Sequence, residues 1–131
     1  MDDDIRPNSV TDSMAVDCQV IQAFHNMVGE DAIAIFVELI DSYLQEAPKA
    51  IQAMQAAVIT GDVASLHLLA HTLKSSSATL GASTLAGLCK DLKICCRTTA
   101  PRNLTATVTL VEEEFTRVRA ALEVERQRCL A

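Results

Sequence analysis

The stretch that decides the fold spans residues 66–81 and reads LHLLAHTLKSSSATLG. On a helix of about 100° per residue, its core-type positions fall on one stripe, as in a helix packed against a hydrophobic core. That stripe consists of Leu66, Leu69, Ala70, Leu73, Ser77 and Leu80. His71 lies about 150° from the centre of the stripe, so we expect its ring to point outward. Gly81 is expected to end the helix in a left-handed conformation.

The residues expected around His71 on this outer surface are mostly small. They lie one or two helical turns away and are Ala64, His67, Leu68, Lys74, Ser75 and Ala78. Such a surface leaves the imidazole open to a docking partner, with the ammonium of Lys74 one turn along the helix. The alternative is that His71 is an ordinary solvated residue of an amphipathic helix.

A metal site at this helix is a weaker hypothesis. His67 and His71 stand one turn apart and could both bind zinc. However, Leu68 stands where the helix of a zinc hydrolase carries its catalytic glutamate, and no second helix supplies a matching pair of ligands. We therefore expect no metal site in this chain.

Hydrophobic periodicity predicts helices on both sides of this stretch. A short helix is expected from about Asp17 to Val28, and a long one from Glu30 to about Val58. In the long helix the apolar steps of three and four stay in phase across Pro48, so we expect one kinked helix. Its expected inward positions are Ile33, Phe36, Val37, Ile40, Leu44, Ala47, Ile51, Met54 and Val58. Tyr43 is expected to be a hydrogen-bonded packing residue.

Capping residues predict where the remaining helices begin. Asp62 is a good N-cap for the helix that carries His71, and Ser83 for the helix after it. A loop is expected over residues 98–103, with Asn103 or Thr105 capping the last helix. The inward positions expected in these last two helices are Leu85, Leu88, Cys89, Leu92 and Cys96, then Leu104, Val108, Val111, Phe115, Val118 and Leu122.

Three glutamates in the last helix predict a solvated face. Glu112, Glu113 and Glu114 are expected at the surface, with Arg117 and Arg119 near enough for exposed ion pairs.

Together these patterns predict an all-α protein, an antiparallel four-helix bundle with a short additional N-terminal helix. Residues 1–16 are acidic, contain Pro7 and show little periodicity, so they are expected to form a flexible tail or linker. Residues 17–131 are expected to form the bundle domain. The core rich in Leu, Ile, Val, Ala and Met, with only 3% aromatic residues, favours packed helices over a β-sandwich.

Composition excludes several function classes. The net charge of −6 and the lack of a basic stripe argue against nucleic acid binding. No apolar run is long enough for a membrane span, and no secretory signal is visible. The five cysteines have no metal-type spacing and are expected to be free thiols of a cytoplasmic protein. No glycine-rich nucleotide loop is present.

The residues around His71 resemble a known signature. Residues 70–77 read AHTLKSSS, and they are followed by LGA at 80–82 and by Leu85, Leu88, Cys89 and Leu92. This pattern resembles histidine-containing phosphotransfer (HPt) domains, of the type found in hybrid sensor histidine kinases. Two positions differ from the usual pattern: Ser75 stands where glycine is commonest, and Lys93 where glutamate is usual.

The resemblance implies a phosphorelay carrier rather than an enzyme. In that family a histidine accepts a phosphoryl group from the aspartyl phosphate of a response-regulator receiver domain and passes it to another receiver. His71 would be the phosphorylated residue, and Lys74 would neutralise charge on the phosphoryl oxygens. Ala64, His67, Leu68, Ser75 and Ala78 would contact the receiver, while Gly81 would be structural. Magnesium would be held by the receiver, and this chain would need no cofactor and act as a monomer.

Two further readings stay open at the level of sequence. The phosphoacceptor and dimerisation segment of a histidine kinase also presents a histidine on a bundle, although it usually has an acidic residue directly after the histidine, where this chain has Thr72. A purely structural bundle, used for interaction with other proteins, would make His71 incidental.

Overall fold

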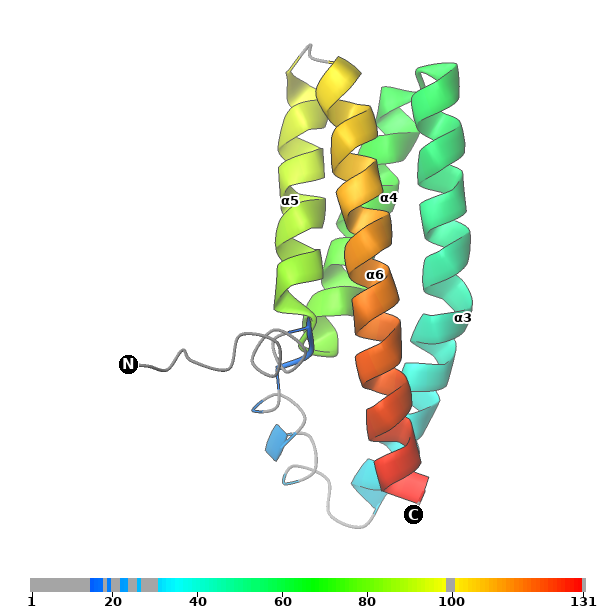
Figure 1. The fold of residues 1–131 in the computed structure, drawn as a ribbon, viewed down its shortest axis with the longest axis vertical. Helices are drawn as coiled ribbons and strands as arrows, with labels where there is room; N and C mark the ends of the chain where they lie inside the picture. Colours follow the sequence, from blue (N-terminus) through cyan, green and yellow to red (C-terminus); the bar gives the residue numbers. More distant parts are fainter. Residues whose placement is uncertain are drawn as a thin grey trace, which may run out of the picture.

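The computed structural model of the protein describes residues 15–17, 19, 22, 23, 26, 31–98 and 101–130. Its long helices are α3 (Asp31–Thr60), α4 (Val63–Thr79), α5 (Ser83–Arg97) and α6 (Pro101–Leu130). Each packs against the next along the chain, and α6 closes the ring by packing against α3. Figure 1 shows that consecutive helices run in opposite directions. The predicted all-α antiparallel four-helix bundle is confirmed.

The N-terminal part of the chain is described at a few positions. Gln19, Gln22, Ala23 and Asn26 are helical, whereas Asp17, where the helix was predicted to begin, is not. The other residues of the predicted helix over 17–28 lie outside the described residues, as does most of the predicted tail. Ala15 and Val16, which we assigned to that tail, are buried in the core. The backbone N–H of Asp17 donates to the carbonyl of Gly81 at 2.8 Å. No helix within the described residues combines the length and hydropathy that a membrane span requires.

Helix α3 continues through Pro48 as a single helix, as the unbroken phase of its apolar stripe predicted. Its buried residues are Ala32, Phe36, Ile40, Tyr43, Ala47, Ile51, Met54 and Ala57. The prediction for Ile33 was wrong, since this side chain is 41% exposed. Figure 1 shows why: the first turns of α3 extend beyond α4 and α5, so fewer helices cover them.

A buried hydrogen bond joins α3 to α4. The hydroxyls of Tyr43 and Ser77 lie 2.7 Å apart in the core, and the ring of Tyr43 packs against Phe115 of α6 with 5.9 Å between the ring centroids. Burial raises the pKa of the Tyr43 phenol. Because both hydroxyls satisfy each other, two polar groups can be buried here without the cost of unpaired ones. The predicted packing role of Tyr43 is confirmed.

The ends of α4 are fixed as its sequence predicted. Asp62 accepts hydrogen bonds from the backbone N–H and the hydroxyl of Ser65, at 3.1 and 2.7 Å, and so caps the helix. At the other end Gly81 has φ of 81°, and the N–H of Ala82 donates to the carbonyl of Ser77 at 2.8 Å. This left-handed turn reverses the chain between α4 and α5.

Two predicted boundaries were wrong. Ser83 is the first residue of α5 and not its cap, because the turn at Gly81 leaves the buried Ala82 in the N-cap position, with no side-chain hydrogen bond. Helix α6 begins at Pro101, before the predicted caps Asn103 and Thr105. Proline suits the first turn of a helix, where its fixed φ is helical and its missing N–H would have no partner in any case.

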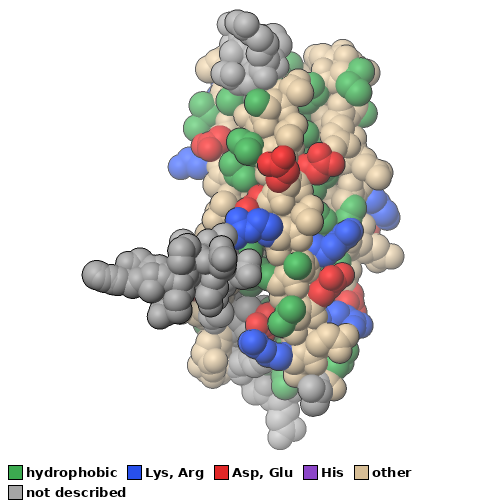
Figure 2. All heavy atoms as spheres, in the orientation of Figure 1, with side chains coloured by type: hydrophobic (Ala, Val, Ile, Leu, Met, Phe, Trp, Pro, Cys, Tyr) green, Lys and Arg blue, Asp and Glu red, His purple; other side chains and the backbone are tan. Residues whose placement is uncertain are grey.

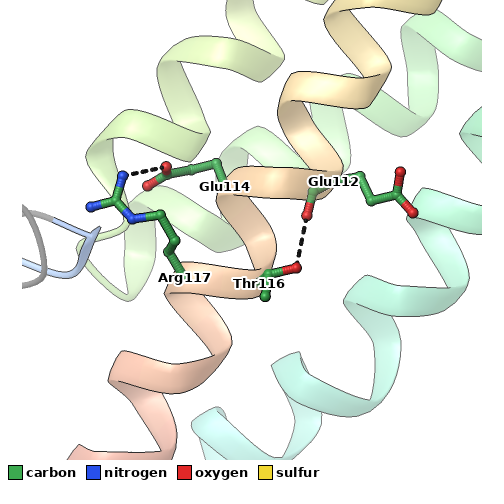
Figure 3. Close-up of polar contacts among 4 residues, drawn as sticks. All are labelled: Glu112, Glu114, Thr116 and Arg117. Carbon is green, nitrogen blue, oxygen red and sulfur yellow. Dashed lines mark hydrogen bonds and ion pairs between the residues drawn. The ribbon is translucent and has the colours of Figure 1, made fainter.

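The predicted solvated face of α6 was wrong at one position. Glu112 and Glu113 are exposed, but Glu114 is buried, at 6% exposure. Figure 3 shows Glu114 and Arg117 turned toward each other on α6, with 3.2 Å between Nη1 of Arg117 and Oε1 of Glu114. Burial raises the pKa of this carboxyl, and Arg117 partly opposes the shift. Glu112 and Glu114 lie at similar angles on the two sides of the inward stripe, so periodicity alone did not distinguish the buried glutamate from the exposed one.

Replacing Gly81 by valine should destabilise the bundle by about 1–3 kcal/mol, the usual cost of a non-glycine residue held in a left-handed conformation. Urea unfolding followed by circular dichroism measures the change. Gly87→Ala is the matched control, because a Cβ at this position inside α5 meets open space and alanine favours helix. Equal stability of Gly81→Val and the wild type would contradict the role of Gly81 in the turn.

Candidate functional site

His71 lies in the middle of α4, on the face turned away from the core. Leu66, Ala70, Leu73 and Ser77 are buried on the opposite face, so the helix has one orientation in which its apolar stripe is covered. That orientation leaves His71 exposed. The sequence prediction for the direction of this side chain is confirmed.

The imidazole of His71 contacts a lysine from the neighbouring helix. Nζ of Lys93, on α5, lies 2.9 Å from Nδ1 of His71, and the Lys93 side chain is half-buried. The other ring nitrogen, Nε2, has no hydrogen bond with another described residue. Nδ1 is therefore held against α5, and Nε2 is the ring nitrogen that no described residue contacts through a hydrogen bond.

Sequence reasoning missed this contact, because we treated Lys93 as a surface charge. A signal was present in the spacing. Helices α4 and α5 are antiparallel about the turn at Gly81, and His71 and Lys93 stand ten residues before and twelve residues after that glycine. Residues at nearly equal distances from a helical hairpin turn lie at the same height on the two helices.

Positive charge gathers on the two helices that carry His71 and Lys93. Lys74 is the only residue of α4 among lysine, arginine, aspartate and glutamate, and it is half-buried. Helix α5 adds Lys90, Lys93 and Arg97 against a single acidic residue, Asp91. The whole chain has a net charge of −6, so this pair of helices is locally basic in an acidic protein.

On the opposite face of the bundle, positive and negative charges are balanced. Figure 2 shows the face dominated by α6, where basic and acidic side chains are interspersed and no histidine is visible. Ion pairs on and across α6, such as Arg126 with Asp41 at 2.6 Å, neutralise charge there. The arrangement leaves unbalanced positive charge on α4 and α5.

The serine and threonine side chains of α4 are bonded to the helix itself. The hydroxyls of Thr72, Ser75, Ser76 and Thr79 donate to backbone carbonyls three or four residues before them. Ser75 in particular donates to the carbonyl of His71 at 3.2 Å. Because each hydroxyl bonds to the backbone of its own helix, it needs no side-chain partner. Short polar side chains can therefore lie beside His71 without interrupting α4.

The residues predicted to form a docking surface lie around His71 as expected. Ala64, Leu68, Ser75 and Ala78 are exposed and His67 is half-buried. Leu68 is 65% exposed, whereas Leu66 and Leu73 of the same helix are buried. The side chains exposed around the ring are thus small or apolar.

His71 lies outside the groove that described residues form along α4. A groove of about 400 Å³ between α3 and α4 is lined by residues including Tyr43, Thr72 and Leu80, but not by His71. Within the described part of the chain, no three His, Cys, Asp or Glu side chains come together as metal ligands would. What the site offers is an accessible imidazole between two lysines.

Comparison with known proteins places this geometry in a family. Residues 38–127 match the model of the Hpt domain, which covers more than half of the chain. The chain belongs to the Hpt domain family. The Hpt domain also resembles, in structure, histidine-containing phosphotransfer protein B (HptB) from Pseudomonas aeruginosa PAO1, with a TM-score of 0.77 and 28% sequence identity. That likeness covers 87% of this chain and 96% of HptB. No curated protein sequence matches the chain significantly.

Replacing His71 by glutamine should leave the melting temperature nearly unchanged, because the side chain is outside the core and surface substitutions usually change stability by less than about 0.5 kcal/mol. The control is Leu73→Ala, two residues away on the buried stripe, which should cost about 2–5 kcal/mol. A loss of stability in His71→Gln comparable to that of Leu73→Ala would contradict the outward placement of the ring.

Proposed function

We propose that this Hpt domain is a phosphorelay carrier that accepts a phosphoryl group on His71. The donor would be the aspartyl phosphate of a response-regulator receiver domain, and the recipient a second receiver. The observation that carries the proposal is the exposed imidazole at the family's histidine position, set between Lys74 and Lys93 on the basic side of an acidic bundle. The match to the Hpt domain and the likeness to HptB support the phosphotransfer role.

The chemistry requires positioning more than activation. A neutral imidazole is nucleophilic through its unprotonated nitrogen, and the acyl phosphate of the donor is already reactive. Phosphoryl transfer is promoted mainly by alignment and by positive charge at the phosphoryl oxygens. The ammonium of Lys74, which has no ion pair with a described residue, would supply such charge.

A carrier of this kind is consumed and regenerated as a substrate of its partners and does not turn over by itself. Magnesium and the acidic residues that bind it would belong to the receiver. The patch formed by Ala64, Leu68, Ser75 and Ala78, with His67 beside it, would contact the receiver around its phosphoaspartate. A monomer would leave this face open.

The cytoplasm is the proposed location. Cys89, Cys95 and Cys96 are free thiols, which supports a reducing compartment. Burial raises the pKa of the Cys89 thiol to about 12, so this cysteine is a packing residue with little thiolate character.

The test is incubation with a phosphorylated receiver domain, followed by intact-mass analysis under mildly alkaline conditions. The wild type should gain one phosphoryl group that is lost in acid. His71→Gln should gain none at the end point of the reaction. His67→Gln keeps the acceptor His71 and should still gain one phosphoryl group at that end point, because a docking residue changes the rate of transfer and not the acceptor atom. Phosphorylation of His71→Gln, or none of the wild type with any receiver that binds it, would overturn the proposal.

Lys74→Ala should slow acceptance of the phosphoryl group by about 10- to 100-fold, because one interaction with a charged group is worth roughly 1.5–3 kcal/mol and about 1.4 kcal/mol changes a rate tenfold. Rapid-quench kinetics with a phosphorylated receiver measures the rate. Lys49→Ala, which removes an exposed lysine from α3, controls for net charge. An unchanged rate in Lys74→Ala would remove this residue from the mechanism.

A further inference from the structure

The contact between Lys93 and His71 constrains the protonation of the imidazole. A lysine ammonium has three N–H donors and no acceptor. At 2.9 Å from Nζ, Nδ1 of His71 must therefore present its lone pair. A neutral imidazole carries one proton, and this proton then lies on Nε2.

The usual residue at this position of the family pattern has the opposite effect. A glutamate in place of Lys93 could only accept a hydrogen bond when ionised. It would hold a proton on Nδ1 and leave the lone pair on Nε2. Lys93 in place of glutamate therefore does more than reverse a surface charge. It places a hydrogen-bond donor, where the family has an acceptor, against Nδ1 of His71.

We propose that Lys93 is a positioning residue that keeps Nδ1 of His71 unprotonated, both in the resting domain and after phosphorylation, and so lengthens the lifetime of the phosphohistidine. The claim about the lifetime of the phosphohistidine rests on the proposed function. The claim about the tautomer of the resting ring is independent of phosphotransfer.

The transfer step then requires that Nε2 loses its proton, because in this tautomer the lone pair of the ring lies on Nδ1. As that proton passes to water, the electron pair of the N–H bond becomes available on Nε2 and forms the bond to phosphorus. The P–O bond to the receiver's aspartate breaks with its electron pair left on the carboxylate. The product carries the phosphoryl group on Nε2 and a free lone pair on Nδ1, to which Lys93 continues to donate.

Loss of the phosphoryl group to water is opposed by the same contact. Water forms a bond to phosphorus, the P–N bond breaks, and the ring departs with that electron pair and takes up a proton. The ring departs more readily when Nδ1 has already gained a proton, because it then leaves neutral and not as an anion. The ammonium of Lys93 occupies the Nδ1 lone pair and repels a further positive charge there. It also attracts the phosphoryl oxygens, and both effects preserve the phosphohistidine.

The test compares Lys93→Glu with Lys90→Glu. Lys90 lies one turn from Lys93 on the same helix and is exposed, so both variants undergo the same change in charge but only Lys93→Glu alters the contact with His71. Nitrogen-15 NMR of histidine-labelled protein above the titration range of imidazole reports which ring nitrogen is protonated. The His71 signals are identified by their loss in His71→Gln.

The wild type and Lys90→Glu should show His71 protonated mainly on Nε2. Lys93→Glu should shift the ratio of tautomers toward Nδ1 by about tenfold or more, as expected for exchange of one charge-assisted hydrogen bond. The same tautomer in wild type and Lys93→Glu would overturn the inference, whether or not the domain accepts phosphate.

The lifetime is measured on phosphorylated protein freed of receiver, by intact mass over time at one neutral pH. The half-life of the phosphohistidine should fall about tenfold in Lys93→Glu and stay within twofold of the wild type in Lys90→Glu. Equal half-lives in all three proteins would overturn the claim of protection, while failure of the wild type to become phosphorylated would count against the proposed function instead.

Discussion

The burial of one face of α4 is the constraint on which the site depends. Leu66, Ala70 and Leu73 fill the core from this helix, and the hydrogen bond between Ser77 and Tyr43 allows the stripe to continue through a polar position. A helix held in this way has one rotation about its axis. The exposed position of His71 therefore follows from the packing of residues on the opposite face, which contribute nothing to the chemistry.

The hairpin between α4 and α5 adds the second half of the site. The left-handed turn at Gly81 sets the height of α5 relative to α4, and that height brings Lys93 against Nδ1 of His71. The candidate site is thus built from an imidazole on one helix and a lysine on the next. The charge around the site is positive because lysine and arginine outnumber acidic residues on α4 and α5. On α3, by contrast, most of the charged side chains are carboxylates.

Much of this arrangement could be predicted from sequence, and the failures have physical causes. Periodicity predicted the inner stripes of α4 and α6 because large apolar residues repeat there at helical spacing. It was wrong at Ile33 and Glu114, because burial at those positions depends on where neighbouring helices end and on which side of the inward stripe they cover. The outward direction of His71 followed from the helical angle. Its partner Lys93 did not, because a contact across a hairpin depends on the geometry of the turn, which we did not use to align the two helices.

The measurement that tests this account most directly is phosphorus-31 and nitrogen-15 NMR of the phosphorylated domain, which identifies the nitrogen bonded to phosphorus. Of the three histidines in the chain, the account predicts that His71 alone carries the phosphoryl group, with phosphorus coupled to Nε2 and with Nδ1 unprotonated. Coupling to Nδ1 of His71, or to either of the other histidines, would contradict it.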